Sequence, residues 1–186
     1  MMTLLSWFAT LFASTQPVTA APNTPAWFWE QTAKGLGGST SCETGSAHLV
    51  AYLRKLPPAD IQTYAREFDK RMAESYSWDL WAMAYLANGG ASDDGFDYFR
   101  GWLILQGKDR FTASLQDPRR ALDGVKAGTL VECEDILAVA AQAYDEATEK
   151  DLPLSGVEMP EHPRGTAWKE EDLPRLFPDI AKRFGS

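Results

Sequence analysis

The sequence between residues 78 and 106 is the most informative part of the chain for its fold, and it reads WDLWAMAYLANGG (78–90) followed by ASDDGFDYFRGWLILQ (91–106). The first part is apolar on nearly every side, which is typical of a helix in the middle of a core. Asn88-Gly89-Gly90 supplies residues that tolerate the left-handed conformation at a helix C-terminus, and Ser92 is a preferred residue at a helix N-terminus. The stretch therefore predicts two Trp-rich helices, 78–88 and 93–106, that form an antiparallel hairpin.

Helical signals occupy most of the remaining chain, and no stretch shows the sustained alternation of a strand. Thr24-Pro25 predicts the start of a helix that ends near Leu36, and Ser46 is expected to cap a second helix that ends before Pro57-Pro58. Further helices are expected directly after Pro57-Pro58, with an apolar face from Ile61 to Met72, at 109–115, just after 118, and at about 133–148, with two short ones at the end of the chain. We predict a mainly α fold, a single-domain helical bundle around the central Trp-rich hairpin. The expected inner face of the 133–148 helix consists of Ile136, Leu137, Ala140, Tyr144 and Ala147.

Length and charge limit the function classes. The chain has 186 residues, 45% of them hydrophobic and 12% aromatic, which fits one globular domain with an aromatic core. Its formal net charge of -8 disfavours nucleic acids and anionic membranes as partners, because both are bound through Lys and Arg. The apolar run from Leu4 to Ala13 is too short for a membrane-spanning helix, which needs about 20 residues.

Residues 1–24 form a separate leader, and residues 25–186 form the predicted domain. The first charged residue is Glu30, and Leu4–Ala13 precedes small residues at Val18-Thr19-Ala20. This pattern is typical of a signal peptide cleaved near Ala20, although the basic segment of a signal peptide is missing. Two readings follow: a secreted or periplasmic protein, or a cytoplasmic protein with a poorly ordered leader.

The two cysteines, Cys42 and Cys133, lie 91 positions apart. In an oxidising compartment they could form one disulfide. We expect instead two ordinary buried thiols. The sequence has no C-x-x-C pair, so neither thioredoxin-type chemistry nor a zinc knuckle is predicted.

The motifs of common enzyme classes are missing from the sequence. Only His48 and His162 are present, and no H-E-x-x-H or G-x-S-x-G pattern occurs. We expect His48 to be a partly buried structural residue and His162 to be solvated. The glycine-rich stretch at 35–41 lacks the lysine of a phosphate-binding loop. The sequence therefore predicts no catalytic residue and no cofactor.

Three carboxylates gather at the start of the expected 93–106 helix: Asp93, Asp94 and Asp97. Acids are favoured there because they complement the free N–H groups and the helix dipole. Arg100 is expected to form a partly buried ion pair with Asp97 or with Asp79. The alternative is that the three aspartates hold a divalent ion such as Mg²⁺ in a metal-assisted hydrolase or phosphoesterase.

The same segment is crowded with aromatic side chains, and not all of them can lie inside one core. Aromatic residues beside an arginine are typical of protein interfaces. We therefore predict a protein-interaction or regulatory module, with a possible protein partner, whose surface lies around 92–100. The candidate binding residues are Trp81, Asp93, Asp94, Asp97, Arg100 and Trp102.

These motifs resemble a known family. The segments WDLW (78–81), YLANGG (85–90) and SDDGFDYFRGWLI (92–104) resemble the bacterial domain-of-unknown-function family 4240. The resemblance extends from WFWE (27–30) to the closing segment DLPRLFP (172–178). It implies an uncharacterised cytoplasmic protein without an established catalytic residue or cofactor, and some members carry the label of molybdenum metabolism regulator. The signal-like leader departs from the cytoplasmic expectation.

Overall fold

The computed structural model describes residues 21 and 23–185, so most of the expected leader lies outside the described residues. Within that part of the chain the fold has nine α-helices, two 3-10 helices and no strand. This confirms the mainly α prediction. The elements are α1 (Pro25–Leu36), α2 (Cys42–Leu53), α3 (Pro58–Glu74), α4 (Trp78–Asn88), α5 (Asp93–Leu105), α6 (Lys108–Gln116), η1 (Pro118–Leu122), α7 (Asp135–Thr148), η2 (Glu170–Asp172), α8 (Leu173–Leu176) and α9 (Pro178–Phe184).

The end of α4 and the start of α5 lie at the expected capping residues, Gly89 and Ser92, and Ser77 caps the start of α4. The Ser77 side chain accepts a hydrogen bond from the backbone N–H of Leu80, and Gly89 ends α4 with a φ of 72°. The Ser92 side chain accepts from the backbone N–H of Gly95 at 3.1 Å and so caps α5. The end of α4 at Gly89 and the start of α5 at Ser92 could be predicted, because each depends on residues adjacent in sequence.

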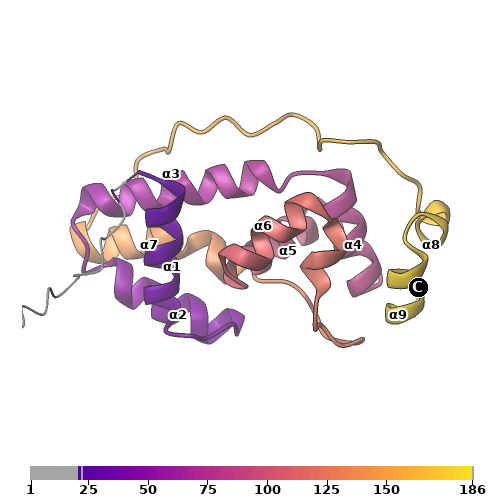
Figure 1. Cartoon of the computed structure of the whole chain (residues 1–186). Helices are drawn as coiled ribbons and strands as arrows, with labels where there is room; N and C mark the ends of the chain where they lie inside the picture. Colours follow the sequence, from indigo (N-terminus) through magenta and orange to yellow (C-terminus); the bar gives the residue numbers. More distant parts are fainter. Residues whose placement is uncertain (1–20, 22, 186) are drawn as a thin grey trace, which may run out of the picture.

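The helices form an elongated bundle with α5 in its middle (Figure 1). Helix α5 contacts α2, α3, α4, α6 and α7. Helices α3 and α7 lie side by side, α1 and α2 lie at one end, and α4, α8 and α9 lie at the other. The most extensive helix contacts join α2 to α7 and α1 to α2, so the Trp-rich pair is central without being the largest interface.

Aromatic side chains make up much of the core. Phe28, Tyr64, Phe96, Phe99 and Phe111 are fully buried. A continuous series of ring contacts, with centroids 5.0 to 6.3 Å apart, crosses the α4–α5 pair. This series, which we call the aromatic row, consists of Trp168, Trp78, Trp81, Phe96, Phe99 and Trp102.

Two local expectations were wrong. Helix α2 begins at Cys42 rather than after Ser46, and Ser46 is buried inside it. The short helix expected after Asp117 is present as a 3-10 helix, whose N-terminus is capped by the Asp117 side chain. The inner face of α7 is rotated from the expected one, because α7 packs on α2, α3 and α5 together. The buried residues of that helix are Ile136, Val139, Ala143 and Tyr144, whereas Ala147 is exposed.

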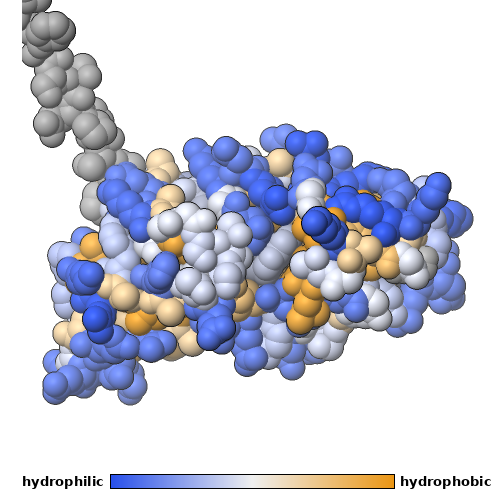
Figure 2. Space-filling model, turned by 90° about the horizontal axis from the view of Figure 1, so that it is seen from below, coloured by the Kyte–Doolittle hydropathy of each residue, from blue (hydrophilic) through white to orange (hydrophobic). Residues whose placement is uncertain are grey.

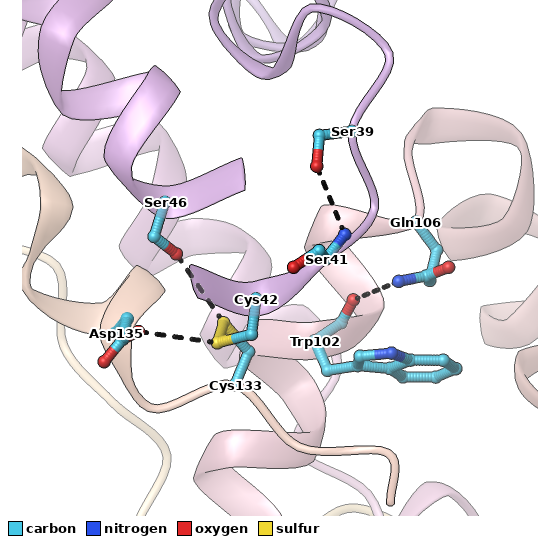
Figure 3. Close-up of a disulfide and its surroundings, with 8 residues drawn as sticks. All are labelled: Ser39, Ser41, Cys42, Ser46, Trp102, Gln106, Cys133 and Asp135. Atoms are coloured by element: carbon cyan, nitrogen blue, oxygen red, sulfur yellow. Dashed lines mark hydrogen bonds between the residues drawn. A yellow bond between two sulfur atoms is a disulfide. The ribbon is translucent and has the colours of Figure 1, made fainter. Parts of the chain in front are cut away.

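The expectation of two free thiols was also wrong, because Cys42 and Cys133 form a disulfide (Figure 3). The Cα atoms of the two cysteines are 5.2 Å apart, within the range that a disulfide requires. The Ser46 hydroxyl lies 3.7 Å from the Cys133 sulfur and can donate to it. The bridge ties the start of α2 to the segment that leads into α7. Helices α2 and α7 form the most extensive helix–helix contact of the described fold.

Residues 151–168, which we call the strap, cross the bundle in an extended conformation. Figure 1 shows the strap passing over α3 from the end of α7 to the last helices. Its Arg164 pairs with the backbone around Ser77 as an isolated bridge, and Trp168 packs edge-on against Trp78 and Tyr85. The loop predicted for this region is thus confirmed.

The described helices include none that is both long enough and apolar enough to cross a membrane. The molecular face seen from below is mainly hydrophilic, and its hydrophobic residues form separate small patches (Figure 2).

Candidate functional site

The N-terminus of α5 presents two exposed aspartates. Asp93 and Asp94 occupy its first turn, and both are exposed. The capping hydrogen bond of this helix is made by Ser92, which accepts from the N–H of Gly95. Asp93 and Asp94 add negative charge at the positive end of the helix dipole, where that charge is stabilised.

Arg100 holds the third aspartate in place from inside the protein. Its guanidinium is paired with Asp97 and also donates to the backbone carbonyl of Met72. The same group lies 4.8 Å from the ring centroid of Tyr76 and 5.0 Å from that of Phe96. Because Arg100 is only 2% exposed, it positions Asp97 and does not itself form surface. The expected Asp97–Arg100 pair is confirmed.

Asp79, the other expected partner of Arg100, lies elsewhere. Its side chain is exposed and lines a separate cavity of about 200 Å³ together with Arg164 of the strap.

Tyr98 lies among these acids. Burial is the largest cause that raises the pKa of its phenol, followed by the negative charges of Glu134 and Asp94. A hydrogen bond to Glu134 and the charge of Asp97 act in the same direction. Carboxylates from two parts of the chain, α5 and the loop before α7, therefore act on the phenol.

The loop before α7 brings its acids to this place through hydrogen bonds. The backbone N–H of Cys133 donates to the carbonyl of Tyr98 at 2.9 Å. The Asn88 side chain accepts from the N–H of Val131 and donates to a Glu132 carboxylate oxygen, both at 3.0 Å. We call the resulting surface the acidic rim, and it consists of Asp93, Asp94, Asp97, Tyr98, Glu132 and Glu134.

The acids of the rim do not gather round one point. Across residues 21 and 23–185, no group of three or more His, Cys, Asp and Glu side chains is arranged to hold a metal ion. Asp93, Asp94 and Asp97 therefore do not form such a group, and the Asp97 carboxylate is occupied by Arg100.

The two candidate tryptophans belong to the aromatic row. Trp81 is stacked between Trp78 and Phe96, and its indole N–H donates to the carbonyl of Ala91 at 3.0 Å. Trp102 is 8% exposed at the other end of the row. Neither tryptophan is part of the acidic rim.

Sequence reasoning missed Tyr98, Glu132 and Glu134. Glu132 and Glu134 flank Cys133, so a prediction of the disulfide would have shown that this segment is held against the start of α2. No local pattern shows that the same segment also contacts α5.

The two histidines lie outside the rim. His48 is exposed, contrary to the expectation of partial burial, and its ring nitrogen lies 3.5 Å from the carbonyl of Leu36 near the end of α1. His162 is exposed in the strap, as expected.

Comparison with known proteins gives one match. No curated protein and no solved structure matches the chain. One family, described as "Protein of unknown function (DUF4240)", matches residues 27–146. The match begins at Trp27, where the resemblance was expected to begin, but it ends within α7, so the strap and the closing segment 172–178 lie beyond it. The description names no activity, and the molybdenum label remains an expectation. Because the match covers well over half of the sequence, from α1 to α7, the chain belongs to the DUF4240 family.

Proposed function

We propose that the protein is an interaction module whose acidic rim binds a Lys- or Arg-rich segment of a partner protein. The observation that carries this proposal is the position of Tyr98, where the backbone carbonyl accepts from the N–H of Cys133 at 2.9 Å and so holds the loop that carries Glu134 against the start of α5, which carries the exposed Asp93 and Asp94. The raised pKa of the Tyr98 phenol, due first to burial and then to Glu134 and Asp94, agrees with this placement. A tyrosine with carboxylates near it offers an apolar surface and negative charge to one basic side chain.

The charges of the rim are available to a partner. Asp93, Asp94 and Glu134 are exposed, and none of them forms an ion pair with a described cation. Charge complementarity of this kind accelerates association and sets specificity more than it raises affinity. A moderate affinity that falls as salt is added is therefore expected.

A defined peptide tests the proposal. We would titrate a Lys/Arg-rich peptide and an Asp/Glu-rich peptide of the same length into the protein and measure binding by fluorescence anisotropy. The variant D93N/D94N removes two negative charges from the rim. The matched control E158Q/E161Q removes two negative charges from the strap, where Glu158 and Glu161 are both exposed. We expect the basic peptide alone to bind, D93N/D94N to bind it several-fold more weakly, and the control to bind it normally.

If D93N/D94N and E158Q/E161Q lost affinity for the basic peptide equally, binding would depend only on the net charge of the protein, which would contradict a local site. Thermal stabilisation of the unsubstituted protein by millimolar Mg²⁺, absent in D93N/D94N, would instead favour the metal-assisted hydrolase alternative.

We also propose that the domain works in an oxidising compartment. The support is the Cys42–Cys133 disulfide, since such bridges persist outside the reducing cytosol. A disulfide typically stabilises a fold by about 2 to 4 kcal/mol. The intact mass of protein isolated without reductant is expected to lie about 2 Da below that of the reduced chain, the mass of the two hydrogens lost on oxidation. Two thiols alkylated quantitatively in freshly opened cells would contradict this proposal.

A further inference from the structure

A cavity with a cationic lining lies away from the acidic rim, beside the last residue of the aromatic row. It has a volume of about 370 Å³, which is within the usual range of small-molecule sites. Helix α5 contributes Trp102 and Gln106, and α6 contributes Arg110. The loop after η1 contributes Lys126 and Thr129, and Thr40, two residues before α2, also lines the cavity. We call this cavity the Trp102 pocket.

The charged side chains that line the pocket are positive, although the protein as a whole is negatively charged. The chain carries a formal net charge of -8, yet two cationic side chains and no carboxylate line the pocket. Arg110 and Lys126 form no ion pair with any described acid. The nearest acid along the loop, Asp123, is paired with Arg120 at 3.0 Å. Both cations are thus free to bind an anion.

The walls of the pocket are held in place. The backbone N–H of Thr129 donates to the carbonyl of Lys126 at 3.1 Å, which closes a turn around the lysine. Arg183 of α9 donates to the carbonyl of Val125 just before that turn. The disulfide ties together two of the segments that line the pocket, because Thr40 lies two residues before Cys42 and Thr129 lies four residues before Cys133. Figure 3 shows Trp102 and Gln106 on one side of this bridge and Ser46 and Asp135 on the other.

We propose that the Trp102 pocket binds a small organic anion with a planar apolar body. The carboxylate or phosphate of the ligand contacts Arg110 and Lys126, since arginine forms paired hydrogen bonds with such groups. The planar body contacts Trp102, because aromatic rings attract flat apolar surfaces. Thr40, Gln106 and Thr129 also line the pocket and supply uncharged polar groups that orient a ligand.

Calorimetry with four probes tests both parts of this proposal. The probes are 2-naphthoate and 2-naphthyl phosphate, which have a ring and a charge, 2-naphthylmethanol, which has only the ring, and inorganic phosphate, which has only the charge. We expect the two naphthyl anions to bind more tightly than the other two probes, and their relative affinities distinguish a carboxylate ligand from a phosphate ligand. Equal binding of naphthylmethanol and the naphthyl anions, or no binding of any probe at millimolar concentration, would overturn the proposal.

Single substitutions locate the binding. R110A and K126A each remove one cation from the pocket and are expected to weaken the naphthyl anions about tenfold, the usual effect of one charge-assisted hydrogen bond. K150A is the matched control, since Lys150 is exposed after α7 and does not line the pocket. Equal affinity in all three variants would place the binding elsewhere and reject the Trp102 pocket. The rim variant D93N/D94N should retain the probe affinity, which separates this test from that of the proposed function.

Discussion

At the scale of single residues, the close approach of α5 to α7 depends on one glycine. A Cβ added to Gly101 would lie 2.8 Å from a methyl of Ile136 and 2.9 Å from the carbonyl oxygen of Cys133. The methyl group can move, but the backbone oxygen is fixed beside the disulfide. Gly101 is therefore required for packing rather than for a left-handed backbone conformation.

We predict that G101A lowers the free energy of unfolding by about 1 to 3 kcal/mol, the usual cost of overpacking a core. The matched control is G95A in the same helix, where an added Cβ finds no atom closer than 3.5 Å. This control should be neutral or slightly stabilising, because alanine favours a helix more than glycine does. Chemical denaturation of both variants measures the difference, and equal stabilities would show that α7 can move away from α5 without cost.

Burial decides how much each arginine–aspartate pair contributes. Arg100 and Arg175 each pair with an aspartate three residues earlier, but the Arg100 side chain is 3% exposed and that of Arg175 is 73% exposed. Arg100 also donates to the carbonyl of Met72 and packs on two aromatic rings.

We predict that R100A costs about 3 kcal/mol of stability, since it removes a buried partner and opens a cavity. R175A should change stability by less than about 0.5 kcal/mol, because exposed pairs are screened by water. Urea denaturation measures the stability of the two variants. Each variant lacks an arginine that pairs with an aspartate three residues earlier, so the two differ mainly in burial. A cost of R100A as small as that of R175A would show that water replaces the buried guanidinium.

At the scale of elements, sequence reasoning was reliable where a helix end depends on its own neighbours. Gly89 ends α4 and Ser92 caps α5 as expected. It was unreliable for α2, whose N-cap Ser41 forms no capping hydrogen bond through its side chain. The disulfide at Cys42 and the packing on α7 are contacts between distant residues, and a pattern of local spacing carries no information about them. The acidic rim was half predicted for the same reason, because Glu132 and Glu134 come from a distant loop.

The far ends of α2 and α7 are joined by an ion pair. Arg54 follows α2 directly and lies 2.9 Å from Glu146 of α7. The pKa of the Glu146 carboxyl is lowered from its ordinary value of 4.5, first by the hydrogen bond from Arg54 and then by that from Gln142. A carboxyl whose pKa is lower in the folded state stabilises the fold above its unfolded pKa. This stabilisation is lost as the pH falls through the lowered, folded-state pKa.

We predict that E146Q is less stable than the unsubstituted protein at neutral pH and that the difference vanishes in acid, below the lowered pKa of Glu146. The difference should also shrink in high salt, because both partners are exposed. Thermal unfolding as a function of pH measures it. The control E149Q changes an exposed acid just after α7 for which no ion pair is found among the described residues. A deficit of E146Q that persists unchanged in acid would mean that the ion pair is not its cause.

At the scale of the whole molecule, the strap determines which aromatic surfaces are exposed. An aromatic patch open to solvent was expected near the Trp-rich pair, but Trp168 of the strap lies against Trp78 and Tyr85. The composition of the strap, rich in proline and glycine, indicated a surface loop without indicating where it lies. The family match ends at residue 146, before the strap begins, so the segment that covers Trp78 and Tyr85 lies outside the matched range.

Trp168 is the main attachment of the strap to α4. Its indole N–H donates to the carbonyl of Trp78 at 2.7 Å, and the backbones of Trp78 and Arg164 are hydrogen-bonded at 2.9 Å. We predict that W168A releases this part of the strap, so that the amide hydrogens of Trp78 and Arg164 exchange faster with solvent, while the amides of α2 and α7 keep their protection. The control L154A removes a strap side chain that is 98% exposed and should leave every exchange rate unchanged. Faster exchange throughout the bundle in W168A would show instead that the strap is a necessary part of the core, since the domain would then open as one cooperative unit when its cover is loosened.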